Sequence, residues 1–294
     1  MNDLPDIPDL PSGPWPLIGE GLWSSIHDLG DGTVLKLVRR HAGGTGGLGS
    51  GVALHRREVL ALTLLGGEEN DFFRVPALIG EGAFDSGAHA GWLRMSHLPG
   101  TAPDAGRILY APPETRDAFG ERLGAAIAEF HIAATAHAQA ANSKLGDSIA
   151  RSITLARDRF GQPDDHRAAD TVLAAWAGEC EAGPLVFVHG DVNLSNVMDP
   201  GPRAAPGLVD FAEAGFSLAE ADFRHMDGWG PLRDAVFRGY AARSGHAPDM
   251  RRVHLASAAN ALCTIAIEGG SGHPREAMRR RGQLEHCLEA AGLS

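Results

Sequence analysis

The segment FVHGDVNLSNVM, residues 187–198, places an acid and an amide five residues apart in a polar loop that follows an apolar strand. The acid is Asp191 and the amide is Asn196. A second segment, GLVDFAEAG at residues 207–215, puts Asp210 at the end of another apolar strand. If the two strands pair as a hairpin, Asn196 and Asp210 converge at one mouth.

This convergence favours a particular chemistry. Two oxygen ligands at the end of a hairpin with arms 196–198 and 208–210 suit a Mg²⁺ ion that also takes phosphate oxygens. Asp191 would then face an acceptor hydroxyl. A metal ion, positioning groups and an acid that orients the nucleophile are the requirements of phosphoryl transfer. We therefore predict Asn196 and Asp210 as metal ligands and Asp191 as the catalytic residue.

The same residues carry a family resemblance. The H-x-D-x-x-x-x-N spacing from His189, followed by a strand-borne Asp-Phe, resembles the protein-kinase-like fold. Gly190 after the histidine, and Asp210 followed by Phe-Ala, are similar to the aminoglycoside phosphotransferase and choline kinase group of small-molecule kinases. The resemblance covers nearly the whole chain. It implies an α+β, bilobal protein-kinase-like fold, with a small antiparallel β-rich N-terminal lobe carrying one helix and a larger, mainly helical C-terminal lobe.

Local patterns along the chain agree with that organisation. We expect a nucleotide-binding lobe over residues 1–95, a hinge over 96–100, and a catalytic and substrate-binding lobe over 101–294. Turn residues separate short apolar runs in the first lobe, whereas helical spacing dominates the second. The expected elements are strands ending near Glu20 and over 24–28 and 33–38, a helix near 54–65, two strands around residues 85–87, and helices near 149–160 and 166–179.

The glycines near the N-terminus resemble a nucleotide loop. In IGEGLWSS, residues 18–25, Gly19 and Gly21 are followed by Ser24 where protein kinases have a third glycine. Such a loop lets backbone N–H groups approach phosphates closely. The resemblance therefore assigns Gly19, Gly21 and Ser24 to nucleotide binding.

A lysine and a glutamate complete the expected nucleotide site. Of the 26 basic residues, only Lys36 and Lys144 are lysines. A lysine kept inside an apolar strand suggests a need for a compact ammonium charge. In the resemblance, Lys36 contacts the α- and β-phosphates and Glu58, on the next helix, holds it in place. The backbone of the hinge at Met95, Ser96 and His97 would bind adenine.

A competing motif lies at residues 44–49, where GTGGLG satisfies the dinucleotide fingerprint G-x-G-x-x-G. An oxidoreductase of that type needs a parallel sheet of alternating strands and helices, which the chain does not supply. We interpret residues 43–51 as a connector between the third strand and its helix.

Three further polar residues receive structural roles. His189 is expected to pack the catalytic loop, because the neighbouring aspartate fills the role of base. His131 is expected to be a satisfied packing residue, and Asp222 to anchor the loop by hydrogen bonds. The remaining histidines lack metal-binding spacing such as H-E-x-x-H, so no zinc site is predicted.

The predicted activity is Mg²⁺-dependent transfer of the γ-phosphate of ATP to a hydroxyl of a small molecule. Family analogy favours an aminoglycoside-like or amino-alcohol acceptor; choline, homoserine, a sugar or a macrolide stays open. A non-catalytic nucleotide-binding protein of the same fold is the alternative from another class. Candidate acids for the acceptor pocket are Glu213, Asp227, Asp234 and Glu268.

Composition sets the outer limits. A net charge of −11 argues against a nucleic-acid partner, which needs a basic surface. No apolar run is long enough for a membrane span, and the acidic, proline-rich start is unlike a signal peptide. Three separated cysteines fit free thiols in a reducing compartment, so a cytoplasmic location is expected, with the chain a monomer or weak homodimer.

Overall fold

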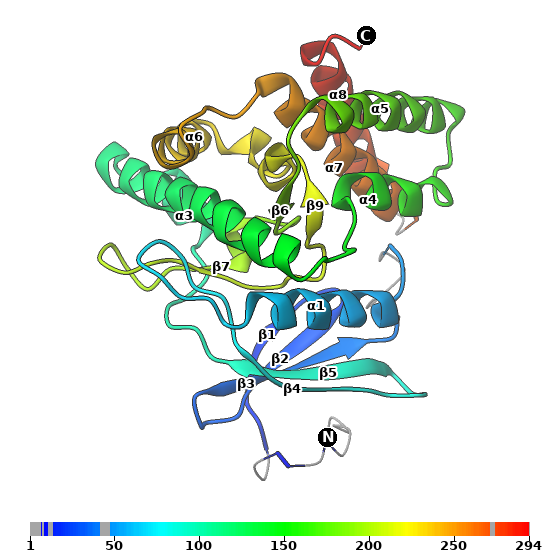
Figure 1. Ribbon diagram of the computed structural model, residues 1–294. Coiled ribbons are helices and arrows are strands. Elements are labelled where there is room, and N and C mark those ends of the chain that lie inside the picture. The colour runs from blue at the N-terminus through cyan, green and yellow to red at the C-terminus, as the bar shows by residue number, and fades with distance from the viewer. Residues whose placement is uncertain (1–6, 8, 11–13, 42–47, 271–273, 294) are drawn as a thin grey trace.

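A computed structural model describes residues 7, 9–10, 14–41, 48–270 and 274–293. A five-stranded sheet with one long helix forms the first part of the chain, and helices form most of the remainder (Figure 1). The α+β fold predicted from the sequence is confirmed. Among the described residues, no helix has both the length and the hydropathy to span a bilayer.

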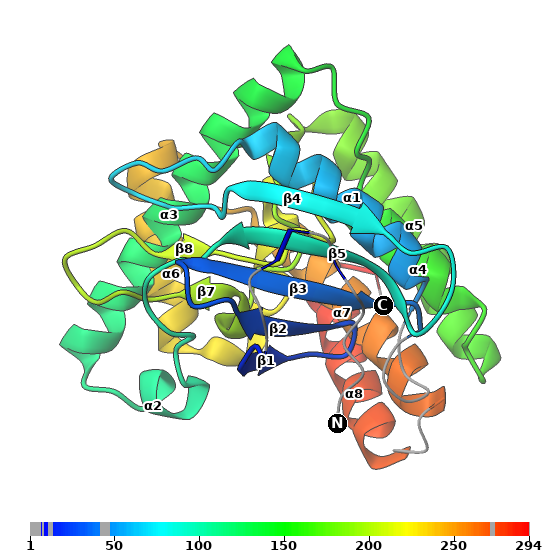
Figure 2. The same ribbon diagram turned by 90° about the horizontal axis from the view of Figure 1, so that it is seen from below.

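The sheet is antiparallel throughout, in the order β1-β2-β3-β5-β4 (Figure 2). This arrangement rules out the parallel dinucleotide-binding sheet that the GTGGLG motif raised. Gly30 and Gly32 make the tight turn between β2 and β3, with φ of 76° and 83°, a region that glycine enters without strain. The strands are β1 Leu17–Glu20, β2 Ser24–Asp28, β3 Thr33–Arg39, β4 Leu78–Ala83 and β5 His89–Ser96.

Helix α1, Gly51–Leu65, lies between the sheet and the helical part (Figure 1). It begins three residues before the predicted start at residue 54, because the Ser50 side chain accepts a hydrogen bond from the amide of Ala53 and caps the helix. Gly51 is required there: a Cβ would lie 1.7 Å from the carbonyl oxygen of Arg39. Residues 42–47, which hold most of the GTGGLG motif, lie outside the described residues.

The helical part contains two closely packed pairs of helices. Helix α3 packs along α6, and α7 packs along α8. An apolar core joins this part to the sheet; in it the ring of Phe130 lies 5.7 Å from that of Phe73 and 5.8 Å from that of Phe211. The helices are α2 Ala105–Leu109, α3 Pro113–Ala140, α4 Ser148–Arg157, α5 Pro163–Ala182, α6 Pro231–Ser244, α7 Met250–Gly270 and α8 Pro274–Ala290.

Two short strand pairs carry the loops of interest. β7 (Val197–Met198) pairs with β8 (Gly207–Leu208), which confirms the predicted hairpin. β6 (Val186–Val188) pairs with β9 (Gly215–Ser217), a pairing that the sequence did not suggest. Both loops that bear the predicted acids therefore leave from paired strands, between the sheet and the helices. Three 3₁₀ helices complete the described elements: η1 Leu194–Asn196, η2 Ala219–Phe223 and η3 Met226–Trp229.

Candidate active site

A buried lysine joins three elements at the centre of the molecule. The Nζ atom of Lys36, on β3, lies 2.7 Å from Oε2 of Glu58 on α1 and 2.8 Å from Oδ1 of Asp210. The structure thus contains the ion pair expected between Lys36 and Glu58. Burial by itself lowers the pKa of the Lys36 ammonium, but the carboxylates of Asp210 and Glu58 outweigh it and raise that pKa. Lys36 is therefore a cation at neutral pH.

The β7–β8 hairpin brings Asn196 and Asp210 to one end. Val197 faces Leu208 in the ladder, and the amide of Val209 donates to the carbonyl of Asn196 at 3.0 Å. Asp210 adopts a φ of 70°, in the left-handed region that most L-residues avoid. Such conformations concentrate at functional sites, where the surrounding structure imposes them.

The predicted catalytic loop, residues 189–196, is held in place by Asp222. The carboxylate of Asp222 accepts hydrogen bonds from the backbone N–H of His189 at 3.0 Å and from that of Gly190 at 2.6 Å. It also accepts a hydrogen bond from Nε2 of His131 at 2.8 Å. Gly190 has a φ of 81°, and a Cβ there would lie 2.3 Å from the carbonyl oxygen of Glu213. The predicted anchoring role of Asp222 and the packing role of His131 are both confirmed.

His189 ties the loop to the hairpin. Its Nε2 donates to the carbonyl of Val209 at 2.9 Å, and its Nδ1 accepts the amide of Asp191 at 3.2 Å. Because one ring nitrogen donates and the other accepts, we assign His189 the neutral form with its proton on Nε2. Because both nitrogens serve backbone groups, His189 has no free nitrogen for proton transfer, and its predicted structural role is confirmed.

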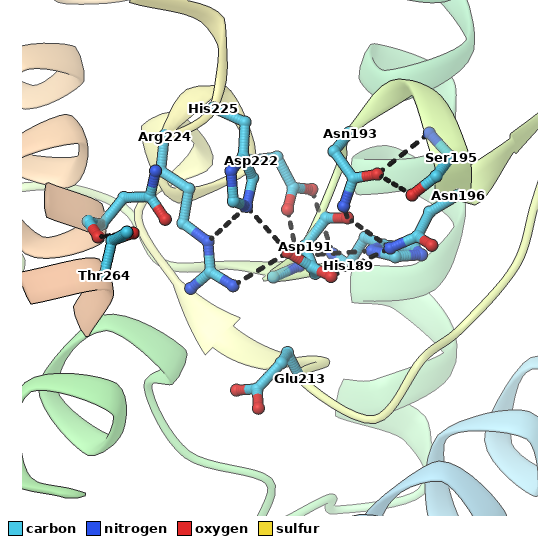
Figure 3. A network of polar contacts seen from close by, with 12 residues as sticks. His189, Asp191, Asn193, Ser195, Asn196, Glu213, Asp222, Arg224, His225 and Thr264 are labelled. Atoms are coloured by element: carbon cyan, nitrogen blue, oxygen red, sulfur yellow. Dashed lines mark hydrogen bonds and ion pairs between the residues drawn. The ribbon is translucent and has the colours of Figure 1, made fainter. Parts of the chain in front are cut away.

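Both carboxylate oxygens of Asp191 have hydrogen-bond partners within the protein (Figure 3). One carboxylate oxygen, Oδ2, accepts Nδ2 of Asn196 at 2.9 Å. The other, Oδ1, lies 2.7 Å from Nε2 of His225 and 3.2 Å from Nη2 of Arg224. Burial by itself raises the pKa of Asp191, but the hydrogen bond from His225 and the charges of His225 and Arg224 outweigh it and lower that pKa well below its usual range. Asp191 is a carboxylate at neutral pH.

Sequence reasoning missed Arg224 and His225. They lie 33 and 34 residues beyond Asp191, just after η2, and no spacing rule connects them to the catalytic loop. The one available signal was Asp222. Since Asp222 anchors the loop, the two residues that follow η2 must lie close to Asp191.

A cavity of about 330 Å³ opens between the sheet and the helices, and the predicted residues divide around it. Ser24, Lys36 and Glu58 line it from the sheet and α1, and Asp191 and Asp210 line it from the loops. Asn196 is not among the lining residues but reaches the cavity through its bond to Asp191. Gly19, Gly21, Met95, Ser96 and His97 are likewise not among the lining residues.

The glycine turn near the cavity is braced by an arginine. The amide of Gly21 donates to the carbonyl of Ser24 at 2.9 Å and closes the turn. The guanidinium of Arg39 donates to the carbonyls of Gly21 and Ser24 and pairs with Glu20. The contacts of Arg39 thus stabilise the shape of the turn. Contact between the turn and phosphate remains a prediction.

The hinge amides already have partners. The N–H of Ser96 donates to the carbonyl of Ala77 at 3.0 Å, and that of His97 donates to the carbonyl of Gly32 at 2.9 Å. Met95 is paired within the sheet with Val34 and Leu78. The assignment of residues 95–97 to adenine binding therefore rests on the resemblance alone.

The four candidate acceptor acids separate in space. Glu213 lines the cavity, where its carboxylate is bonded to Arg151 on α4. Asp234 lies 3.2 Å from Arg233 on the exposed side of α6. Asp227 lies with His254 and Cys287, all three offering ligand atoms within 4.8 Å of one another. Glu268 is not among the lining residues. Of the four, the structure places Glu213 alone at the cavity.

Comparison with known proteins identifies the family. A family model described as "Phosphotransferase enzyme family" matches residues 53–256, more than half of the chain. The chain belongs to the phosphotransferase enzyme family. The matched span contains Glu58, the loop 189–196, the hairpin and Asp222, whereas Lys36 lies before it.

Solved structures share the fold of this phosphotransferase. A GDP and kanamycin complex of APH(2″)-IIIa is 17% identical, with a TM-score of 0.67 over 96% of this chain and 95% of that one. A type I macrolide 2′-phosphotransferase is 21% identical, with a TM-score of 0.60 over 93% and 91%. A choline/ethanolamine kinase family protein from Mesorhizobium loti is 16% identical, with a TM-score of 0.62 over 96% and 90%. A search of curated protein sequences found no match.

Proposed function

We propose that this phosphotransferase moves the γ-phosphate of ATP, with Mg²⁺ bound, to a hydroxyl of a small molecule. The convergence of Lys36, Asp191 and Asp210 on one cavity carries the proposal. Phosphoryl transfer is achieved mainly by positioning and by stabilising charge, and these three groups supply a cation, a carboxylate beside the acceptor and a carboxylate for a metal ion.

The donor set at the hairpin end fits Mg²⁺. Asp210 and Asn196 offer carboxylate and amide oxygens, the hard ligands that this ion prefers. The Nδ2 atom of Asn196 is directed at Asp191, so the opposite amide atom, Oδ1, is the one left to act as a ligand. When bound, Mg²⁺ would neutralise the phosphate charge; Asn196 and Asp210 are the residues that would hold it.

The protein's own groups have separate tasks. Lys36, a cation fixed between two carboxylates, binds phosphate oxygens. Asp191 orients the acceptor hydroxyl through a carboxylate oxygen and takes its proton as the new P–O bond forms. Because the pKa of Asp191 is lowered, it is a weak base, and orientation is its larger contribution.

Substitution of Asp191 tests the proposal. Asp191→Asn keeps the size of the side chain but removes its charge, and we expect phosphoryl transfer to fall by at least about 10³-fold while nucleotide affinity stays unchanged. Transfer is followed by ADP release in the presence of hydroxyl compounds, and affinity by titration with a non-hydrolysable nucleotide. Asp85→Asn, in an exposed turn before β5, is the matched control. Transfer at the wild-type rate in Asp191→Asn would reject the assignment.

The same assay also tests which nucleotide, ATP or GTP, is the phosphate donor. ATP is the donor expected from the resemblance, whereas the APH(2″)-IIIa structure that shares the fold contains GDP. Parallel titrations with ATP and GTP establish the preference. Absence of transfer with both nucleotides, together with retained nucleotide binding, would favour the non-catalytic alternative.

A further inference from the structure

Part of the cavity wall is formed by residues other than Lys36 and its two carboxylate partners. We call it the acceptor end and define it by Glu213, Arg224, His225, Asn260, Cys263 and Thr264. Residues 260, 263 and 264 are three and four apart on α7, so they share one face of that helix. Figure 3 shows Arg224, His225 and Thr264 on one side of Asp191. An acceptor whose hydroxyl reaches Asp191 must lie against these residues.

The acids at the acceptor end already have cationic partners. The Glu213 carboxylate is bonded to Arg151, which also donates to the Glu213 carbonyl at 3.2 Å. Arg57 adds a second guanidinium nearby, bonded at 3.3 Å to the carbonyl of Ala214. Asp191 is held by Arg224, whose side chain is only 9% exposed, and by His225. Each carboxylate is therefore balanced within the protein.

The remaining groups at this end are uncharged. Asn260 offers an amide group. The Thr264 hydroxyl donates to the carbonyl of Asn260 at 3.0 Å and so offers its oxygen as an acceptor. Burial raises the pKa of the Cys263 thiol to about 12, so it stays neutral. The described residues of this wall thus provide hydrogen bonds and no uncompensated negative charge.

An ammonium group that leaves water for such a site loses its hydration without gaining a carboxylate. Arg224 and Arg151 would repel it as well. We propose that the acceptor is an uncharged hydroxyl compound, of sugar, polyol or nucleoside type, bound by Asn260 and Thr264, and that the site selects against amines. This inference rests on the proposed phosphotransfer and narrows its acceptor.

Matched acceptors of different charge test the inference through turnover. Glycerol, ethanolamine and glycerate form one set; glucose, glucosamine and gluconate form another; kanamycin and choline are added as amines. ADP release above the acceptor-free rate is measured for each compound with Mg²⁺ and nucleotide. We expect the highest kcat/KM in the uncharged group, at least about tenfold above the amine of the same set. A higher value for an amine or for an acid overturns the proposal.

A binding experiment decides the charge preference even if none of these compounds is phosphorylated. Kanamycin and choline are titrated into wild-type protein that holds Mg²⁺ and a non-hydrolysable ATP analogue. We expect no saturable binding below about 1 mM. Micromolar binding of either amine that is lost in Glu213→Gln overturns the proposal.

A gain-of-binding variant gives the converse test. Arg151→Gln exposes the Glu213 charge to the cavity, so choline and kanamycin should bind at least about fivefold tighter than to wild type, and adding Glu213→Gln should abolish the gain. Because a misfolded variant does not gain affinity, the result is independent of stability. Arg157→Gln, also on α4 but paired with Asp170, is the matched control and should show no gain. Equal amine affinity in wild type and Arg151→Gln contradicts the charge balance.

The two proposals fail in different ways. Rapid transfer to an amine refutes the uncharged acceptor and leaves phosphotransfer intact. Loss of transfer with every donor and acceptor, with the amine titrations still negative, refutes phosphotransfer and leaves the charge selectivity of the cavity in place.

Discussion

The nucleotide end and the acceptor end of the cavity differ in how their charges are balanced. At the nucleotide end, one cation, Lys36, faces two carboxylates, Glu58 and Asp210. At the acceptor end, Asp191 and Glu213 face Arg224 and Arg151, one guanidinium for each carboxylate. The first arrangement leaves a negative charge that a metal ion can compensate, whereas the second leaves none. This difference in charge balance is what the two proposals use: the first end to receive ions, the second to receive an uncharged group.

Asp210→Asn should have the largest effect on the difference in charge balance between the two ends. It removes the excess negative charge at the nucleotide end, so we expect transfer to fall by about 10³-fold or more. Nucleotide binding should also lose its dependence on Mg²⁺, because the carboxylate that would hold the ion is gone. Titration of nucleotide with and without Mg²⁺ measures both effects. Mg²⁺-dependent binding equal to that of wild type would show that Asp210 is not a ligand.

Asp222→Asn should affect both ends together, because Asp222 holds the loop between them. The variant leaves the backbone amides of His189 and Gly190 without a charged acceptor, and we expect a loss of about 3 kcal/mol in the free energy of unfolding. Chemical denaturation measures the loss, with exposed Asp85→Asn as control.

The pH dependence of that stability has a defined sign. Burial raises the pKa of Asp222, but the hydrogen bond and charge of His131 outweigh it and lower that pKa in the folded state. A carboxylate with a lowered folded-state pKa stabilises the fold above its unfolded value of about 3.9, and this contribution is lost as the pH falls below it. The difference in stability between wild type and Asp222→Asn should therefore shrink below about pH 4. A constant difference would contradict the shift.

The two ends also differ in how far the sequence alone reveals them. The sheet and the hairpin follow from local patterns, since strand periodicity and turn glycines are visible without a structure. The Lys36–Glu58 pair was expected from the family resemblance, which the single lysine in an apolar strand supported. Helix α1 begins three residues before its predicted start. The sequence pattern missed this, because capping by Ser50 and the close approach of Gly51 to Arg39 depend on neighbours in space.

The acceptor end could not be read in this way. Arg224 and His225 meet Asp191 only because Asp222 ties η2 to the catalytic loop. Charge alone could not tell which of the candidate acids faces the cavity: Glu213, Asp227, Asp234 or Glu268. Even for Glu213, no sequence pattern pointed to its partner Arg151, which lies 62 residues earlier on α4. Long-range pairing of side chains, rather than their identity, determines this end of the site.

His225→Ala should have the smallest effect, confined to the acceptor end. His225 is a positioning residue: its Nε2 donates to Asp191 at 2.7 Å and helps to lower the pKa of that carboxylate. Without this donor the pKa of Asp191 rises, so the acidic limb of the kcat/KM profile should move to higher pH while nucleotide affinity stays unchanged. His225→Gln, whose amide can donate in place of the ring, should restore most of the wild-type profile. If both variants lowered kcat equally without moving the profile, His225 would serve only to pack the loop, and the ionisation of Asp191 would depend on Arg224 instead.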